Sequence, residues 1–198
     1  TVRAGNRLAL AGRLMHSVAA GSFVRLSSVV ALWRAWQETR RGKRRQPRLA
    51  AFDLDADTHL IRLQRALAAD TWQPGGYRLA IVREPKTRLI AAPEIADRIV
   101  QRALLDEIGP GYERSFIDHS FACCRGRGPQ RALLQYLAWT REHRFRLSLD
   151  VRRYFASIEH ATLYRLFARR LDDRRTLSLI ARLLAAGGAV YQSPLARS

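Results

Sequence analysis

The chain has 198 residues, with 35 Lys and Arg against 17 Asp and Glu, a formal net charge of +18. This length favours one domain with or without an appendage, and 47% apolar residues can fill a core, which excludes wholesale disorder. No uncharged apolar run approaches the roughly 20 residues of a membrane span, so no membrane partner is expected. The only cysteines, Cys123 and Cys124, are adjacent, which excludes a disulfide framework and a Cys-x-x-Cys metal site and favours a cytoplasmic setting.

The excess of positive charge predicts a polyanionic partner, with nucleic acid as the first choice. All basic residues except Lys43 and Lys86 are Arg. Such a skew also arises from a GC-rich coding sequence, so the charge leaves that alternative open. Residues 1–26 contain no acid and are expected to be a poorly ordered basic leader, although their composition also resembles a transit peptide. Residues 27–198 are expected to form the folded domain.

The first predicted helix follows Ser27 or Ser28 as N-cap and buries Val29, Leu32, Trp33 and Trp36. The run RRGKRRQPR at 40–48 breaks this helix, with Gly42 and Pro47 as punctuation. It is a solvated basic loop at least and a phosphate contact at most. A second helix is expected over 53–69, with Leu60, Leu63 and Leu67 on one face.

A turn at 71–76 precedes two strands, 77–84 and 88–92, which the alternation predicts to pair as a hairpin. After Pro93 a helix is expected over 94–109, with Ile95, Ile99, Ala103, Leu104 and Ile108 on one side. Further helices are predicted over 129–143, 159–170 and 172–186, with glycines 187 and 188 ending the last. One more short strand is predicted over 144–151, with Asp150 at its end. This mixture of elements predicts an α+β fold without a doubly wound nucleotide-binding unit.

Asp150 is the candidate catalytic residue on chemical grounds. A carboxylate held at the end of an apolar strand and facing a cleft suits a divalent metal site for phosphoryl transfer. The alternative is ordinary, because an Asp after a strand is often a turn former or a helix cap.

Three segments in series resemble the bacterial reverse transcriptases, the RNA-directed DNA polymerases of diversity-generating retroelements, retrons and group II introns. They are EPKTRLIAAPEIADRIVQRALLDEI (84–108), SFACCRGRGPQRAL (120–133) and LSLDVRRYFASIEHATL (147–163). The resemblance covers roughly residues 30–195. It implies the fingers and first half of the palm of a right-hand polymerase, truncated before the second catalytic carboxylate segment and the thumb.

The resemblance also implies roles for individual residues. Asp150 matches the catalytic Asp that binds two Mg²⁺ ions, and the main-chain carbonyl of Val151 would help hold one of them. Lys86 and Arg88 match the residues that contact the triphosphate of the incoming dNTP, with a solvated turn as the alternative. Phe155 matches the bulky residue beneath the sugar, which excludes ribonucleotides, with core packing as the alternative.

The expected partners are an RNA template, a DNA primer and dNTPs, and the sequence leaves open which accessory protein the enzyme would need. Arg98 and Arg102 lie one turn apart and would face template phosphates, with Asp97 and Asp106 as alternative partners for them. The other residues implied to contact nucleic acid lie in the RGRG loop, where Gly126 and Gly128 allow close approach of a strand: Arg125 and Arg127.

The family uses three carboxylates, two of them from an aromatic-x-Asp-Asp box that this sequence lacks. Asp172 and Asp173 do not supply it, because they are expected to begin a helix, where acids stabilise the N-terminal end. We therefore expect this chain alone to be inactive as a polymerase. The unpaired palm strand should also make it prone to aggregate. The alternatives are a non-catalytic RNA- or DNA-binding module that retains the fingers surface, and an unrelated basic protein.

Overall fold

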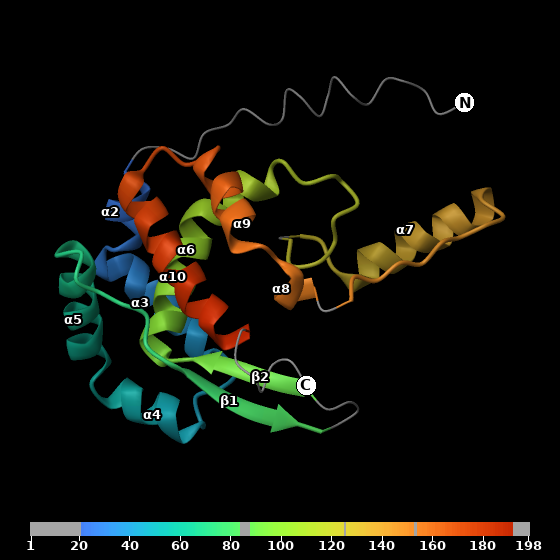
Figure 1. The fold of residues 1–198 in the computed structure, drawn as a ribbon. Helices are drawn as coiled ribbons and strands as arrows, with labels where there is room; N and C mark the ends of the chain where they lie inside the picture. The colour runs from blue at the N-terminus through green and yellow to red at the C-terminus, as the bar shows by residue number, and fades with distance from the viewer. Residues whose placement is uncertain (1–20, 84–87, 125, 153, 192–198) are drawn as a thin grey trace. The chain divides into compact units, whose positions relative to one another are not determined.

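The computed structural model describes residues 21–83, 88–124, 126–152 and 154–191, and for Arg88, Leu89, Ala156 and residues 189–191 it describes the backbone. Helices and one two-stranded sheet make up the described part of the chain (Figure 1), which confirms the α+β class. The chain divides into two compact units. Among the described residues, one unit contains residues 110–158, and the other contains residues 21–109 together with 159–191.

The larger unit begins with α2 (Ser22–Leu26) and α3 (Val29–Arg40). Phe23 and Leu26 are each 1% exposed, so the leader predicted over 1–26 is wrong for α2, whose apolar side chains belong to the core; residues 1–20 lie outside the described residues. Ser28 caps α3 as predicted, since its Oγ accepts a hydrogen bond from the backbone N–H of Ala31 at 3.2 Å.

Leu32 and Trp36 are fully buried on α3, as predicted, whereas Val29 and Trp33 are 45% and 40% exposed. The buried stripe runs through Leu32, Ala35 and Trp36. Trp33 is turned about 100° from Leu32 around the helix axis and so lies at the edge of this stripe. Val29 lies in the first turn of the helix, beside the N-cap.

The helix predicted over 53–69 is α5 (Ala56–Ala68), and an additional helix that was not predicted, α4 (Pro47–Leu54), precedes it. Pro47 was predicted only as a residue that helps end the preceding helix, but it begins α4, because the first turn of a helix does not use the N–H group that proline lacks. Leu60, Leu63 and Leu67 are buried on one face of α5, as predicted.

The predicted hairpin is confirmed as β1 (Tyr77–Val82) and β2 (Arg88–Pro93). The strands are antiparallel, and their register runs from Tyr77 opposite Pro93 to Val82 opposite Arg88. β2 leads directly into α6 (Ile95–Glu113), which buries Ile99, Val100, Ala103, Leu104 and Ile108 and continues past the predicted end at 109.

The chain returns to the larger unit with α9 (His160–Ala168) and α10 (Arg174–Tyr191), whose Leu179 and Ile180 complete the core. The prediction that glycines 187 and 188 end the last helix is wrong, because α10 runs through both. A Cβ at Gly188 would lie 3.1 Å from the His160 ring, so glycine allows α9 and α10 to approach closely here.

The smaller unit contains α7 (Pro129–Glu142), as predicted, and the short α8 (Tyr154–Ser157). The strand predicted over 144–151 is wrong: this segment runs back beside α7 without joining a ladder, and Arg146 Nη1 donates a hydrogen bond to Tyr136 Oη (Figure 1). A strand needs a partner for its backbone groups, and no other strand is present in the described residues of this unit.

Candidate functional site

Asp150 lies in the exposed segment between α7 and α8. Its carboxylate forms no hydrogen bond or ion pair with the described residues, although Arg146 and Arg152 are close in sequence. The alternative role as a helix cap is not observed, because α8 begins four residues later. Asp150 is therefore accessible to solvent and to a cation from outside the chain.

Val151 and Phe155, the other residues implied to act with Asp150, are also exposed, by 60% and 68% respectively. The alternative of core packing for Phe155 is therefore wrong in the described structure. The Phe155 ring contacts Tyr154 edge to face, with ring centroids 5.2 Å apart. Asp150, Val151 and Phe155 therefore all lie in an exposed segment that a ligand can reach.

A two-Mg²⁺ site needs several oxygen ligands, most of them carboxylates or substrate phosphates. The described residues contain no group of three or more His, Cys, Asp or Glu side chains that could hold a metal ion. Asp150 and the carbonyl of Val151 would provide one carboxylate and one carbonyl oxygen. This donor set does not fit two Mg²⁺ ions, so no catalytic step follows from the described residues alone.

The larger unit contains the predicted fingers hairpin. Arg88 begins β2, where its backbone pairs with Val82, while its side chain and the whole of Lys86 lie outside the described residues. Arg83 is exposed at the end of β1. The backbone thus places Arg83 and Arg88 at the turn end of the hairpin, on either side of 84–87.

Arg98 and Arg102 both lie on α6, but their surroundings differ. Arg102 forms an ion pair with Asp106 at 2.8 Å, which is the alternative predicted for it. Asp97 does not pair with Arg98: it is 2% exposed, and its Oδ1 accepts a hydrogen bond from Gly75 N at 3.1 Å. Burial is the main cause that raises the Asp97 pKa; the Gly75 bond opposes it, and nearby Glu94 adds to it.

Arg127 holds a loop together. Its Nη1 donates hydrogen bonds to the carbonyls of Ile117 at 2.8 Å and Ser120 at 3.1 Å, and Asp118 lies 4.0 Å from Nη2. Gly126 has a φ of +68°, which glycine adopts without strain. Arg127 therefore has a structural role that the sequence did not indicate, and Arg125 lies outside the described residues.

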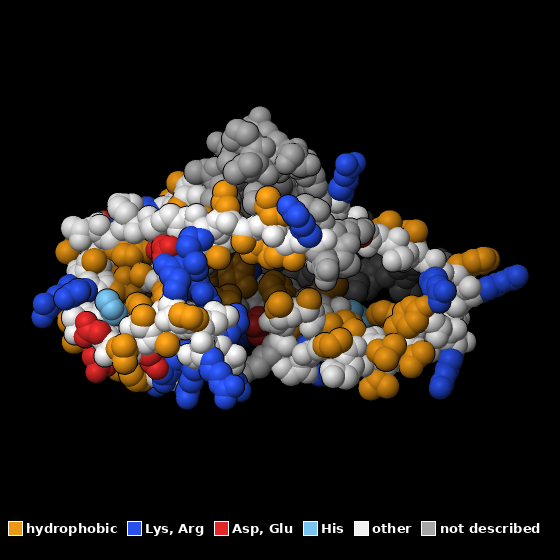
Figure 2. Space-filling model, turned by 90° about the horizontal axis from the view of Figure 1, so that it is seen from below, with side chains coloured by type: hydrophobic (Ala, Val, Ile, Leu, Met, Phe, Trp, Pro, Cys, Tyr) orange, Lys and Arg blue, Asp and Glu red, His pale blue; other side chains and the backbone are white. Residues whose placement is uncertain are grey.

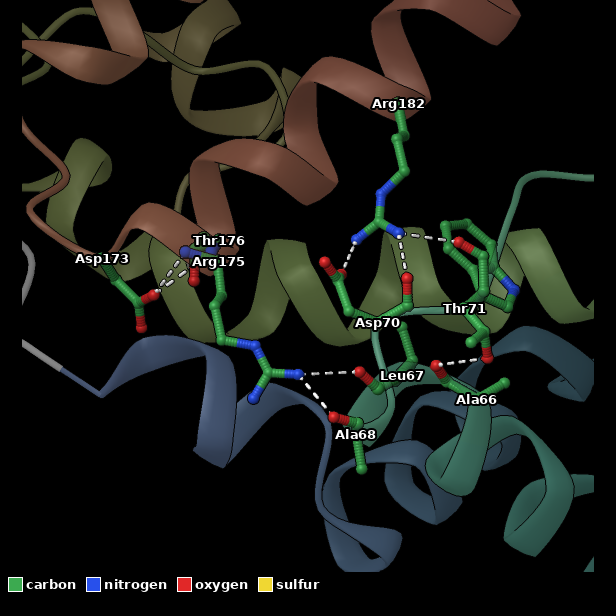
Figure 3. Close-up of polar contacts among 10 residues, drawn as sticks. Ala66, Leu67, Ala68, Asp70, Thr71, Asp173, Arg175, Thr176 and Arg182 are labelled. Atoms are coloured by element: carbon green, nitrogen blue, oxygen red, sulfur yellow. Dashed lines mark hydrogen bonds and ion pairs between the residues drawn. The ribbon is translucent and has the colours of Figure 1, made fainter.

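The Asp172–Asp173 pair lies directly before α10, which confirms the prediction that these acids stand at the N-terminal end of a helix. Asp173 Oδ1 accepts hydrogen bonds from the backbone N–H groups of Arg175 at 3.0 Å and Thr176 at 3.2 Å (Figure 3). Its Oδ2 accepts one from Phe23 N at 2.8 Å. Burial opposes ionisation, but these hydrogen bonds outweigh it and lower the Asp173 pKa.

Two arginines of α10 bind the end of α5 and the segment that follows it, as Figure 3 shows. Arg175 Nη2 donates to the carbonyls of Leu67 at 3.0 Å and Ala68 at 2.7 Å. Arg182 donates to the Trp72 carbonyl at 2.9 Å and to Asp70 Oδ1 at 2.6 Å. Part of the positive charge is thus structural, and sequence spacing could not reveal it because the partners lie more than 100 residues apart.

No protein family model matches the chain. The chain is 28% identical over 111 residues to Protein YkfC of Escherichia coli strain K12, an alignment that covers 52% of this chain and 28% of YkfC. It therefore spans less than a third of the length of that relative. No helix within the described ranges is long and apolar enough to cross a membrane.

Proposed function

We propose that this chain is the fingers and first palm portion of an RNA-directed DNA polymerase. Asp150 would provide one of three carboxylates that hold two Mg²⁺ ions, and the other two would come from outside the described residues. When bound in a complete enzyme, Mg²⁺ would supply charge neutralisation for nucleotidyl transfer from a dNTP to a primer 3′-hydroxyl. The 198-residue chain alone is then inactive.

The observation that carries the proposal is the exposed, unpartnered carboxylate of Asp150 in a strongly basic chain. By comparison, Asp106 on α6 and Asp118 each lie within 4.0 Å of an arginine nitrogen. Asp150 has no such partner among the described residues, which keeps its oxygens available to a cation. The sequence on either side of Asp150 is the segment that resembles the reverse transcriptases.

The proposal gives the chain's other groups a binding function. Lys86 and Arg88 would bind the triphosphate of a dNTP, since cations at the turn of a hairpin can neutralise phosphate charge. The ring of Phe155 would lie beneath the sugar and exclude a 2′-hydroxyl. Of the four arginines expected on the nucleic acid, Arg98 has no described ion-pair partner and is the best placed to bind a phosphate.

The experiment is primer extension on an RNA template with Mg²⁺ and dNTPs. A protein in which this chain is continued by its downstream coding sequence should extend the primer, and the 198-residue chain should not. Asp150→Asn should abolish extension, whereas the matched substitution Asp172→Asn should not. If the 198-residue chain extends the primer and Asp150→Asn abolishes this activity, the proposal that two further carboxylates come from outside the described residues is wrong.

A second candidate is a non-catalytic nucleic-acid-binding module. The observation that favours it is the lack of any metal-binding group of three side chains in the described part of the chain. It predicts tight binding of primer–template by both the chain and its continued form, with no extension by either.

A further inference from the structure

The loop between α3 and α4 is basic, and the nearby acids pair with only some of its cations. It comprises residues 41–46, RGKRRQ, and all six are exposed. No acid occurs between Glu38 and Asp53, while this stretch holds six Lys and Arg. Three consecutive cations lie at the centre of this basic loop: Lys43, Arg44 and Arg45.

The cations on either side of Lys43, Arg44 and Arg45 are paired with acids. Arg40 forms an ion pair with both carboxylate oxygens of Asp53. Arg48 binds Glu94 at 2.6 Å, and Arg41 lies 3.6 Å from Glu38. The residues on either side of the loop therefore contribute little net charge to an incoming ligand.

Lys43, Arg44 and Arg45 have no ion-pair partner among the described residues. They differ in this respect from Arg175 and Arg182 of α10, whose guanidinium groups are bound to carbonyls. Like charges on three successive residues repel one another, and an external anion relieves this repulsion. The loop therefore has three cations available for binding.

The loop also has a defined shape. Lys43 N donates to the Arg40 carbonyl at 2.9 Å, and Gln46 N donates to the Lys43 carbonyl at 3.0 Å. Gly42, with a φ of +69°, allows the turn. The loop residues line an open hollow of about 640 Å³; they are Gly42, Lys43, Arg44, Arg45, Gln46 and Pro47.

We propose that the basic loop binds the backbone phosphates of a nucleic-acid strand, independently of base sequence. Lys and Arg side chains bind phosphate oxygens with strong charge-assisted hydrogen bonds and release counterions from the strand. Three successive cations suit a ligand with regularly repeated charges better than a single small anion. This inference concerns binding and does not depend on the polymerase proposal.

Fluorescence anisotropy of the 198-residue chain with labelled RNA and DNA strands of about 20 nucleotides tests the proposal. The K43A/R44A/R45A variant should bind both strands roughly tenfold to a hundredfold more weakly at 0.1 M salt. The slope of log K against log salt should fall in magnitude by about 2, because each lost contact with a single strand removes about 0.7. A loss confined to RNA or to DNA would show that the loop reads the sugar and would contradict the proposal.

The matched control is R34A/R62A/R65A, which removes the same charge from exposed positions on α3 and α5. It should weaken binding much less, and equal losses in the two variants would overturn the proposal in favour of a general charge effect. Thermal unfolding should show that both variants are folded, and a K43Q/R44Q/R45Q variant provides a second test if the alanine variant is not. Tighter binding to phosphatidylserine vesicles than to either strand, lost in the loop variant, would also overturn it.

Discussion

The carboxylate of Asp173 accepts a hydrogen bond at 2.8 Å from the backbone N–H of Phe23, a residue 150 positions earlier in the chain. The same carboxylate caps α10 through Arg175 and Thr176. One acid thus satisfies N–H groups at the first turns of α2 and α10, where helices leave such donors without partners. Asp173 thus joins two parts of the larger unit that are distant in sequence.

Replacement of Asp173 by Ala should destabilise the protein by about 1 to 2 kcal/mol, because it removes a helix cap and leaves the Phe23 N–H without its acceptor. Urea unfolding monitored by circular dichroism measures the change. Asp172→Ala is the control and should cost much less, since the Asp172 side chain is exposed. Equal effects of the two substitutions would contradict the role assigned to Asp173.

The stabilisation by Asp173 should depend on pH. Its pKa is lowered in the folded protein from the ordinary 3.8, so the folded state binds its proton less well than the unfolded state does. The contribution is therefore complete above pH 3.8 and is lost as pH falls through the lower folded-state pKa. The difference in unfolding free energy between wild type and Asp173→Asn should shrink on acidification, and a constant difference would argue against this linkage.

Asp97 should show the opposite dependence. Burial raises the pKa of Asp97 in the folded protein above its ordinary value of 3.8. As pH rises from 3.8 through this higher folded-state pKa, ionisation of Asp97 therefore lowers the stability of the folded protein. Its Oδ2 is buried without a hydrogen-bond partner among the described residues. Asp97→Asn keeps an acceptor for Gly75 N and removes the charge, so the free energy of unfolding should increase at pH 7 relative to wild type. Asp97→Ala, which loses the acceptor, should not gain stability.

Arg182→Met should destabilise the larger unit by about 1 to 3 kcal/mol. The side chain is 16% exposed and its guanidinium binds Asp70 and the Trp72 carbonyl, so its loss leaves these acceptors with fewer partners. Denaturant unfolding gives the value, with Arg174→Met at an exposed position of the same helix as control. Indistinguishable midpoints for the two variants would show that the Arg182 contacts are energetically unimportant.

The segment before Asp150 should promote self-association. Phe145, Leu147 and Leu149 are 82–84% exposed and alternate along the chain, a pattern that can pair with a strand of another molecule. Exposed hydrophobic side chains are visible across the described surface in Figure 2. Light scattering should show less aggregation for Leu147→Lys/Leu149→Lys than for wild type. Leu54→Lys, at a lone exposed leucine of α4, should leave aggregation unchanged.

Local patterns in the sequence predicted elements whose causes are local. Alternation predicted the β1–β2 hairpin, Ser28 predicted the cap of α3, and apolar spacing predicted the buried face of α5. The errors arose where distant contacts decide. Gly188 lies inside α10 at a position where a Cβ would crowd the His160 ring. Residues 144–151 form no strand, and the one sheet among the described residues consists of β1 and β2.

The candidate site was predictable in part. The chemistry of Asp150 was inferred from its neighbours in sequence and stays a prediction, while its exposed position is a finding of the structure. The hydrogen-bond partners of individual arginines could not be predicted, because Arg127 and Arg182 bind backbone carbonyls whose positions depend on tertiary structure. The same reasoning separates the neutralised Arg40 and Arg48 from the available cations of the basic loop.

The most direct test of the central proposal compares the rates of dNTP incorporation by wild type, Asp150→Asn and Asp172→Asn in the chain continued by its downstream coding sequence. The proposal predicts that Asp150→Asn lowers the rate by at least about a hundredfold, as expected for loss of a group that stabilises the transition state. Asp172→Asn should stay near the wild-type rate. Incorporation by Asp150→Asn at the wild-type rate would contradict the account.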